Sequence, residues 1–175
     1  RFVPQFAINP GYDDMETFSA EIREHDVRSV RMTPKLHDYP FLDWVVGPWL
    51  DWLSDAKVPL WLNAWQIDPA ELYDAIRDNP NLHVVLSEVH YQHSNWAVPL
   101  LASLPNVSVE ISRFVNMGGI DTLIDTVGEG RILFGSRFPD SPIAPQIYHL
   151  HQCGLSETTL GSICSGNLER LLRMV

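Results

Sequence analysis

The sequence predicts an α/β fold built on a parallel sheet. Short apolar segments with the composition of strands recur about every 25 residues along the 175-residue chain. Segments with the apolar spacing of amphipathic helices lie between them, and prolines and glycines cluster where turns are expected. Regular alternation of strands and helices implies parallel strands joined by right-handed crossovers.

Six segments are predicted to be strands, because each is short, apolar and mostly rich in β-branched or aromatic residues. They cover residues 2–7, 28–32, 58–63, 82–87, 107–111 and 131–134. The segments that follow Met32, Asn63, Ser87 and Phe134 are longer than the other connections and carry many polar and aromatic residues. All four leave the C-terminal ends of strands, which is where α/β folds place their functional sites.

Helical spacing of apolar residues predicts the segments between the strands. The first helix carries Met15, Phe18 and Ile22 on one face, and Asp68 followed by Pro69 is typical of the start of a later one. Trp44, Trp49 and Trp52 fall at helical spacing and are expected to pack, either within the chain or against another subunit. The predicted helices cover residues 15–25, 42–53, 69–76, 96–104, 120–127, 143–152, 158–163 and 168–174.

The chain is expected to form a single domain over residues 1–175, because no linker or low-complexity stretch interrupts it. A closed (β/α)₈ barrel needs eight strands and typically about 250 residues. Six strands therefore predict either an open α/β sheet or a barrel without its first two units. In the second case the edge at residues 2–7 is expected to be covered by preceding chain or by a partner, and the native product to be heavier than 19.9 kDa.

The composition excludes several classes of partner. The formal net charge of −10 disfavours nucleic acids and anionic membranes, which are themselves negative. No apolar run approaches the roughly 20 residues that span a bilayer. Two cysteines, Cys153 and Cys164, form no disulfide framework and have no metal-type spacing, so a cytoplasmic location is expected.

Two motifs resemble a known family. The segment Arg131-Ile-Leu-Phe-Gly-Ser-Arg-Phe-Pro-Asp140 is similar to the last-strand motif R-I-L-F-G-S-D-[YF]-P of the amidohydrolase-related (amidohydrolase 2) family of metal-dependent TIM-barrel hydrolases and decarboxylases. The segment Ile163-Cys-Ser-Gly-Asn-Leu-Glu-Arg-Leu-Leu172 resembles that family's closing helix, I-x-x-x-N-A-x-R-L-L. The resemblance covers nearly the whole chain and implies a barrel represented by its third to eighth strands.

The resemblance also implies that the usual metal site is altered. The family's H-x-H metal pair on the first strand would precede residue 1. Where the family usually has metal-binding residues at the ends of its fifth, sixth and eighth strands, this sequence has Asn63, Glu88 and Arg137. We therefore expect no metal cofactor, with a divalent metal such as zinc as the alternative if residues upstream of Arg1 supply ligands.

The replacements suggest an ion pair. Glu88 and Arg137 would project from the ends of the family's sixth and eighth strands toward one centre, and a buried carboxylate without a cation costs on the order of several kcal/mol. A guanidinium can match that charge with a bidentate fork. We hypothesise that a Glu88–Arg137 pair occupies the space that a metal would fill; the alternative is that both are separate, solvated loop residues.

Candidate catalytic residues are Glu88, His90 and Arg137, with Glu88 or His90 as a general base. A new metal site made of Glu88, His90 and His93 is an alternative, because His90 and His93 have a spacing found in metal sites. His149 and His151 lie in a predicted helix, where such positions point about 200° apart, so they are expected to be structural.

Candidate substrate-binding residues are His37, Asn63, Trp65 and Arg113, which follow strand ends; Tyr91 and Trp96 share this placement. Aromatic walls with a guanidinium suit a flat carboxylated ligand, as in the decarboxylases and lactone hydrolases that the chain resembles. The alternative is that Trp65 and Trp96 only cover the layer between helices and strands.

Two classes of function remain open. In the first, the protein is a hydrolase or decarboxylase of a small carboxylated or cyclic substrate, with a degenerate metal site. In the second, it is a non-catalytic relative that binds a small molecule or supports a partner subunit. The partners expected in either class are a small-molecule ligand and a further copy of the chain in a homo-oligomer. An open cavity above Glu88 would favour ligand chemistry, whereas a mouth filled by Arg137 and Trp65 would favour an inactive scaffold.

Overall fold

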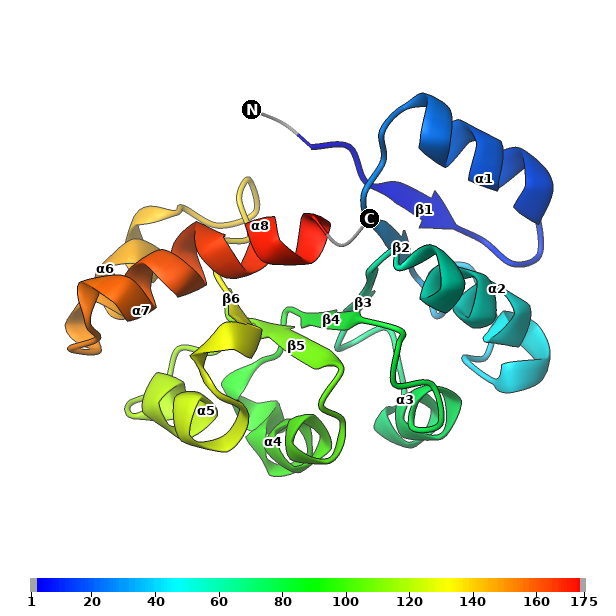
Figure 1. Ribbon diagram of the computed structural model, residues 1–175. Coiled ribbons are helices and arrows are strands. Elements are labelled where there is room, and N and C mark those ends of the chain that lie inside the picture. The colour runs from blue at the N-terminus through cyan, green and yellow to red at the C-terminus, as the bar shows by residue number, and fades with distance from the viewer. Residues whose placement is uncertain (1–2, 174–175) are drawn as a thin grey trace.

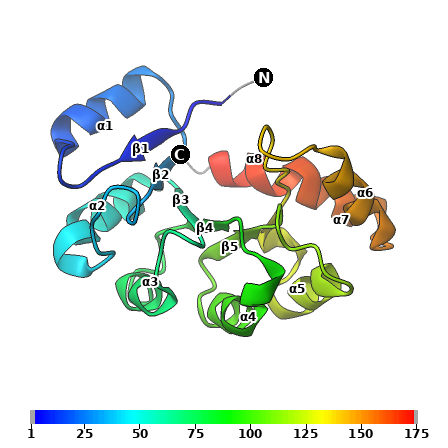
Figure 2. The same ribbon diagram turned by 180° about the vertical axis from the view of Figure 1, so that it is seen from behind.

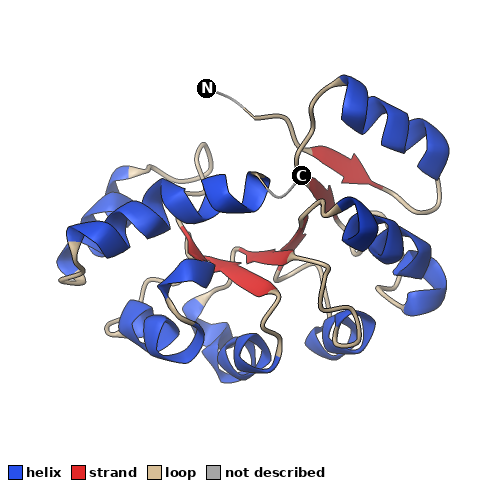
Figure 3. Ribbon diagram, in the orientation of Figure 1, coloured by secondary structure: helices blue, strands red, loops and turns tan. Residues whose placement is uncertain are grey.

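A computed structural model describes residues 3–173, and within them a curved parallel sheet has the strand order β1-β2-β3-β4-β5-β6. Figure 3 shows the strands in one curved row with helices around it. The strands are β1 (Phe6–Ile8), β2 (Val30–Met32), β3 (Leu60–Asn63), β4 (Val84–Ser87), β5 (Val107–Glu110) and β6 (Ile132–Leu133). All six predicted strands are confirmed, each shorter than its apolar segment; residue 2 lies outside the described residues.

Helices follow the strands in regular alternation, as Figures 1 and 2 show from opposite sides. They are α1 (Met15–Glu24), α2 (Asp43–Ala56), α3 (Pro69–Ile76), α4 (Ser94–Ser103), α5 (Gly119–Val127), α6 (Ala144–Gln152), α7 (Glu157–Gly161) and α8 (Asn167–Leu172). Single turns of 3₁₀-helix lie at η1 (Tyr91–His93) and η2 (Glu129–Arg131). The helices predicted at 158–163 and 168–174 are joined without a break, because the π-helical turn η3 (Ser162–Gly166) carries the backbone from α7 into α8; residue 174 lies outside the described residues.

Side-chain caps fix the starts of two helices where the sequence predicts them. Asp68 Oδ1 accepts a hydrogen bond of 2.8 Å from the Ala70 N–H, and Pro69 occupies the first turn of α3. Asp14 Oδ2 accepts from the Thr17 N–H at 2.9 Å, and this bond holds the pKa of Asp14 below its ordinary value. Both caps satisfy N–H groups that a helix start otherwise leaves without partners.

The tryptophans of α2 divide between core and surface. Trp49 is buried and meets the ring of Phe18 edge-on at a centroid distance of 5.4 Å, with Trp52 beside it at 6.1 Å. Trp44 does not pack within the chain, since 76 % of it is exposed, and its packing against another subunit stays a prediction. Its position precedes Trp49 by five residues, which places it on a different face of the helix.

Strand alternation separates the core from the site. One set of side chains faces the helices and is buried with them: Ile8, Val30, Met32, Leu60, Leu62, Val84, Leu86, Val107, Val109 and Ile132. The register places the opposite set in two layers on the inner, concave face. The first contains Arg31, Trp61, Val85 and Ser108, and the second Asn63, Ser87, Glu110 and Leu133. The inner face therefore becomes more polar toward the C-terminal ends of the strands.

Helix α8 covers part of this inner face. Leu171 is buried against Val85 and Leu133, and the half-buried Trp61 packs on the same cluster. Figure 1 shows α8 on the opposite side of the strands from α4 and α5. Helix α8 thus covers part of the concave face, and the C-terminal ends of the strands remain open.

Strands β1 and β6 are the two edges of the sheet, and no pairing joins them within residues 3–173. The architecture is a partial barrel, which is one of the two alternatives that the count of six strands leaves open. None of the helices in the described part of the chain is both long and apolar enough to cross a bilayer.

A half-buried histidine at the far end of the sheet from the site predicts acid sensitivity. His83 Nε2 lies 2.9 Å from Ser108 Oγ, and burial, helped by Arg131 and Arg170, lowers the pKa of His83 to about 4. A folded-state pKa below the unfolded value of about 6.5 gives stability that is complete above that value and lost as the pH falls toward 4. We expect His83→Gln to remove up to about 3 kcal/mol of the acid-induced loss of stability.

Urea unfolding of both proteins at about pH 7 and about pH 4 measures this effect. The exposed His151, replaced by Gln, is the matched control and should follow the unmodified protein. Equal losses of stability in all three proteins on acidification would contradict the role given to His83.

Candidate functional site

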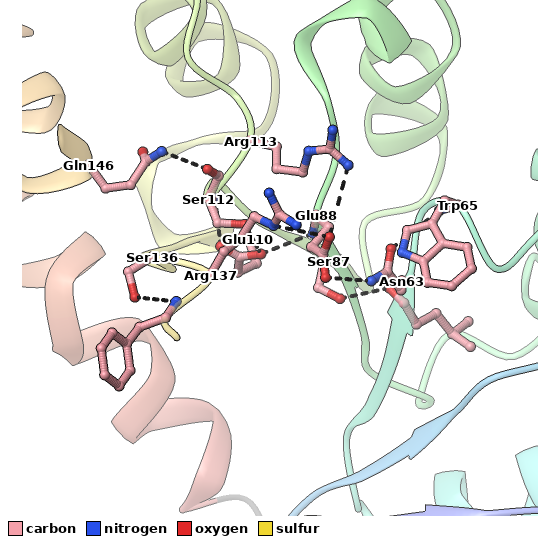
Figure 4. A network of polar contacts seen from close by, with 12 residues as sticks. Asn63, Trp65, Ser87, Glu88, Glu110, Ser112, Arg113, Ser136, Arg137 and Gln146 are labelled. Carbon is pink, nitrogen blue, oxygen red and sulfur yellow. Dashed lines mark hydrogen bonds and ion pairs between the residues drawn. The ribbon is translucent and has the colours of Figure 1, made fainter. Parts of the chain in front are cut away.

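The site is organised around the carboxylate of Glu88, which directly follows β4. Its Oε1 accepts a hydrogen bond of 2.8 Å from Asn63 Nδ2, at the end of the neighbouring strand β3. Its Oε2 lies 3.3 Å from Arg137 Nε and 4.0 Å from the Arg113 guanidinium. Figure 4 shows Glu88 in the middle, with Asn63 on one side and Arg137 on the other.

The predicted Glu88–Arg137 pair is therefore present, and the alternative of two separate solvated residues is wrong. Both side chains are largely shielded from solvent, with 26 % and 30 % of their surface exposed. The predicted bidentate fork is not formed, because Arg137 approaches through Nε alone and without hydrogen-bond geometry. Asn63 already occupies Oε1, so the carboxylate does not offer both oxygens to the guanidinium.

Both members of the pair have left-handed backbones. Glu88 has φ of 53° and Arg137 has φ of 57°, a region that costs a residue with a side chain roughly 1–2 kcal/mol. Such conformations persist where the surroundings enforce them, often at functional sites. Here they turn the two side chains from the strand ends toward each other.

A second carboxylate, Glu110 at the end of β5, lies next to the first. Glu110 Oε1 accepts from the Ser112 N–H at 2.6 Å, and Oε2 accepts from the Glu88 N–H at 3.0 Å and Ser112 Oγ at 2.9 Å. Burial raises the pKa of Glu110 above its ordinary value, although these three donors act in the opposite direction. Gly135 lies so close that a Cβ there would collide with the Glu110 carboxylate.

These residues line a cavity of about 220 Å³ on the inner face of the sheet. Its walls are Arg31, Trp61, Asn63, Ser87, Glu88, Glu110, Ser112, Gly135 and Arg137. Drug-sized ligands occupy pockets of roughly 300–1,000 Å³, so this one suits a smaller molecule. Larger hollows lie elsewhere on the surface, but none of them contains the Glu88 pair.

Three of the predicted site residues line this cavity: Asn63, Glu88 and Arg137. Arg113 stands at its border, 4.0 Å from Glu88. Trp65 is 51 % exposed and is not part of the wall, so it does not fill the mouth. His37 bonds with Thr33 in the loop after β2, also away from the wall.

The structure places His90 outside the cavity as well. His90 caps η1, where its Nδ1 accepts from the Gln92 N–H, and its ring stacks on Tyr91 at a centroid distance of 4.3 Å. Burial, together with Arg113 and His93, lowers the pKa of His90. A catalytic role for His90 remains a prediction.

The residues at the mouth do not fit a divalent metal ion. Within residues 3–173 no three His, Cys, Asp or Glu side chains are placed to hold one, which includes the alternative set of Glu88, His90 and His93. The rings of His90 and His93 lie 6.1 Å apart, and Glu88 already faces two guanidinium groups. His149 and His151 belong to α6, as predicted for structural residues.

Several residues that line the cavity are not among the predicted site residues: Arg31, Trp61, Glu110, Ser112 and Gly135. The alternation of Val107-Ser-Val-Glu110 was a usable signal, because it puts Ser108 and Glu110 on the face opposite the buried valines. Without the neighbouring strands, however, that pattern does not reveal which face contains the site.

Comparison with known proteins identifies relatives of this architecture. Residues 1–174 match the family described as amidohydrolase (Amidohydro_2). No curated protein sequence matches the chain. Among solved structures, the TIM-barrel protein Bb4693 from Bordetella bronchiseptica has a TM-score of 0.80 at 21 % identity, over 99 % of this chain and 67 % of its own.

Two further structures are similar at lower identity. A zinc-bound amidohydrolase from Burkholderia multivorans has a TM-score of 0.68 at 16 % identity, over 95 % of this chain and 71 % of its own. The 2,6-dihydroxybenzoate decarboxylase from Rhizobium has a TM-score of 0.71 at 12 % identity, over 96 % of this chain and 70 % of its own. At these identities the likeness establishes the fold, and the chain spans about two thirds of each relative's length.

The contact between Gly135 and Glu110 predicts a sensitive position. Gly135→Ala would push the Glu110 carboxylate off its three donors, and we expect a loss of about 1–3 kcal/mol in unfolding free energy. Gly161→Ala is the control, because a Cβ in α7 meets no heavy atom and should be neutral or slightly stabilising. Urea unfolding measures both; a Gly135→Ala protein as stable as the control would refute the close packing.

Proposed function

Because the chain belongs to the amidohydrolase family, we propose that it binds a small carboxylated or cyclic molecule in the cavity beside Glu88 and acts on it as a hydrolase or decarboxylase with a degenerate metal site. The observation that carries the proposal is a guanidinium, Arg137, in the wall of a cavity at the C-terminal ends of parallel strands. A relative's name supplies the ligand class, since the Rhizobium structure is a 2,6-dihydroxybenzoate decarboxylase.

The charge of the cavity suits a ligand carboxylate. Arg137 contacts Glu88 through Nε, which leaves its two terminal nitrogens available to a ligand. Arg31 lines the same wall and is held by a bond of 2.6 Å from its Nε to Gln5 Oε1, so its terminal nitrogens are also available. Guanidinium groups bind planar carboxylates through paired N–H donors. Trp61 in the same wall offers an apolar surface to the rest of the ligand.

Glu88 is the candidate for proton transfer in the catalytic version of this proposal. Its carboxylate lines the cavity and lies 3.3 Å from Arg137 Nε, so it would be close to a ligand that Arg137 holds. In hydrolysis, a carboxylate in this position would take a proton from the attacking water molecule. In decarboxylation, its protonated form would give a proton to the carbon that loses its carboxyl group. Asn63 and Arg137 would hold it in place during that step.

A second candidate, a non-catalytic binding protein, is favoured by one feature of the same contacts. Both oxygens of Glu88 are already engaged, Oε1 by Asn63 and Oε2 by Arg137. Contacts with protein groups at both oxygens leave a ligand less access to this carboxylate for proton transfer. The cavity and its guanidinium groups would then serve binding alone.

Titration calorimetry with 2,6-dihydroxybenzoate and benzoate tests the binding that both candidates share. We expect saturable binding, and a loss of about 10- to 100-fold in affinity for Arg137→Gln, the effect of removing one charge-assisted interaction. Arg77→Gln, at the C-terminal end of α3, removes the same charge far from the cavity and should bind normally. Absence of binding by either acid, or equal affinity in both variants, would contradict the proposal.

The fate of the bound acid separates the two candidates. Nuclear magnetic resonance of the incubated acid reports loss of its carboxyl group directly. A product formed by the unmodified protein and not by Glu88→Gln supports catalysis with Glu88 as the residue that transfers the proton. An unchanged acid, bound with Arg137-dependent affinity, supports the binding protein.

A further inference from the structure

Glu110 is the one carboxylate in the cavity wall that the proposed function does not use. Its oxygens already accept three hydrogen bonds from the protein, Oε1 from the Ser112 N–H, and Oε2 from the Glu88 N–H and Ser112 Oγ. A carboxylate engaged in this way has little capacity left for a ligand. Its effect must therefore pass through the residues that it holds.

The most informative of these contacts is the bond from the Glu88 N–H. Glu88 has a left-handed backbone, which residues other than glycine, asparagine and aspartate rarely adopt. The Glu110 carboxylate accepts the Glu88 N–H at 3.0 Å and so stabilises this conformation directly. The conformation in turn determines where the Glu88 side chain lies relative to Asn63 and Arg137.

Glu110 also connects the other strand ends to the site. Gly135, two residues before Arg137, fits only because it has no Cβ beside the Glu110 carboxylate. On the other side, Ser112 is held from α6, since Gln146 Nε2 donates to the Ser112 carbonyl at 2.7 Å. Figure 4 shows this series of contacts running from Gln146 through Ser112 and Glu110 to Glu88.

We infer that Glu110 is the positioning residue of the site: it holds the Glu88 backbone in its left-handed conformation and thereby sets the contact between Glu88 and Arg137. The inference rests on the proposed function only for its consequence, which is that ligand binding depends on Glu110 although Glu110 does not touch the ligand.

The test combines a measurement without ligand and one with ligand, on Glu110→Gln. The first is the Nε–H resonance of Arg137 in a nitrogen-15 spectrum, assigned by its absence in Arg137→Gln. The second is the calorimetric affinity for 2,6-dihydroxybenzoate. Glu129→Gln, which replaces a glutamate of η2 outside the cavity wall, is the matched control. Glu110→Gln and Glu129→Gln are compared under conditions in which circular dichroism shows that both variants are folded.

We expect Glu110→Gln to move the Arg137 Nε–H resonance toward that of an exposed arginine and to weaken binding about tenfold, the effect of one misplaced charge-assisted contact. Gln keeps the shape of Glu and one acceptor oxygen, so Glu110→Ala should have the larger effect. A merely structural role would lower the unfolding midpoint and leave the resonance and the affinity of the folded protein unchanged, and that result would overturn the inference.

Ser112→Ala is the milder second variant if Glu110→Gln does not fold. It removes only the Oγ donor to Glu110 and should move the Arg137 resonance in the same direction by a smaller amount. Failure of the inference and of the proposed function remain distinguishable. If the ligand binds equally well to the unmodified protein and to Glu110→Gln, the positioning role of Glu110 is refuted and the proposed function is not. If the Arg137 resonance moves but neither protein binds the ligand, the positioning role is supported and the proposed function is refuted.

Discussion

A carboxylate on the concave face of a curved sheet must be matched by positive charge or by hydrogen-bond donors, and the site follows from this constraint. An unpaired charge in such a position costs several kcal/mol. Glu88 is matched by the amide of Asn63 and the guanidinium of Arg137, and Glu110 by three donors. The two carboxylates are also joined, because one accepts the backbone N–H of the other.

The parallel sheet determines which residues meet this constraint. Alternation along β3, β4 and β5 sends the apolar residues outward to the helices and the polar ones inward at the strand ends. Parallel strands end at the same edge, so Asn63, Ser87 and Glu110 form one layer. Tight turns after β4 and β6 then bring Glu88 and Arg137 over that layer with left-handed backbones. In this way the packing of the core and the geometry of the site have a common origin.

The positions of the strands and the pairing of Glu88 with Arg137 could be predicted from the sequence, and the reasons are physical. Buried parallel strands are short apolar runs, so their positions were visible, and charge balance required a partner for Glu88. The sequence was not sufficient where local backbone geometry decides the outcome. His90 was expected at the site, but it caps a 3₁₀ turn and stacks on Tyr91. Glu110 was missed, because its importance depends on contacts with Glu88 and Gly135 that lie far away in the chain.

The central claim is that Glu88 and Arg137 act as one coupled pair, and a double-mutant cycle tests it most directly. Urea unfolding of Glu88→Gln, Arg137→Gln and the double variant gives the interaction free energy of the pair. For partly buried charges 3.3 Å apart we predict a coupling of about 1 kcal/mol or more, so that the second substitution costs less than the first. Effects that add within about 0.3 kcal/mol would show that the two residues act independently and would contradict the account.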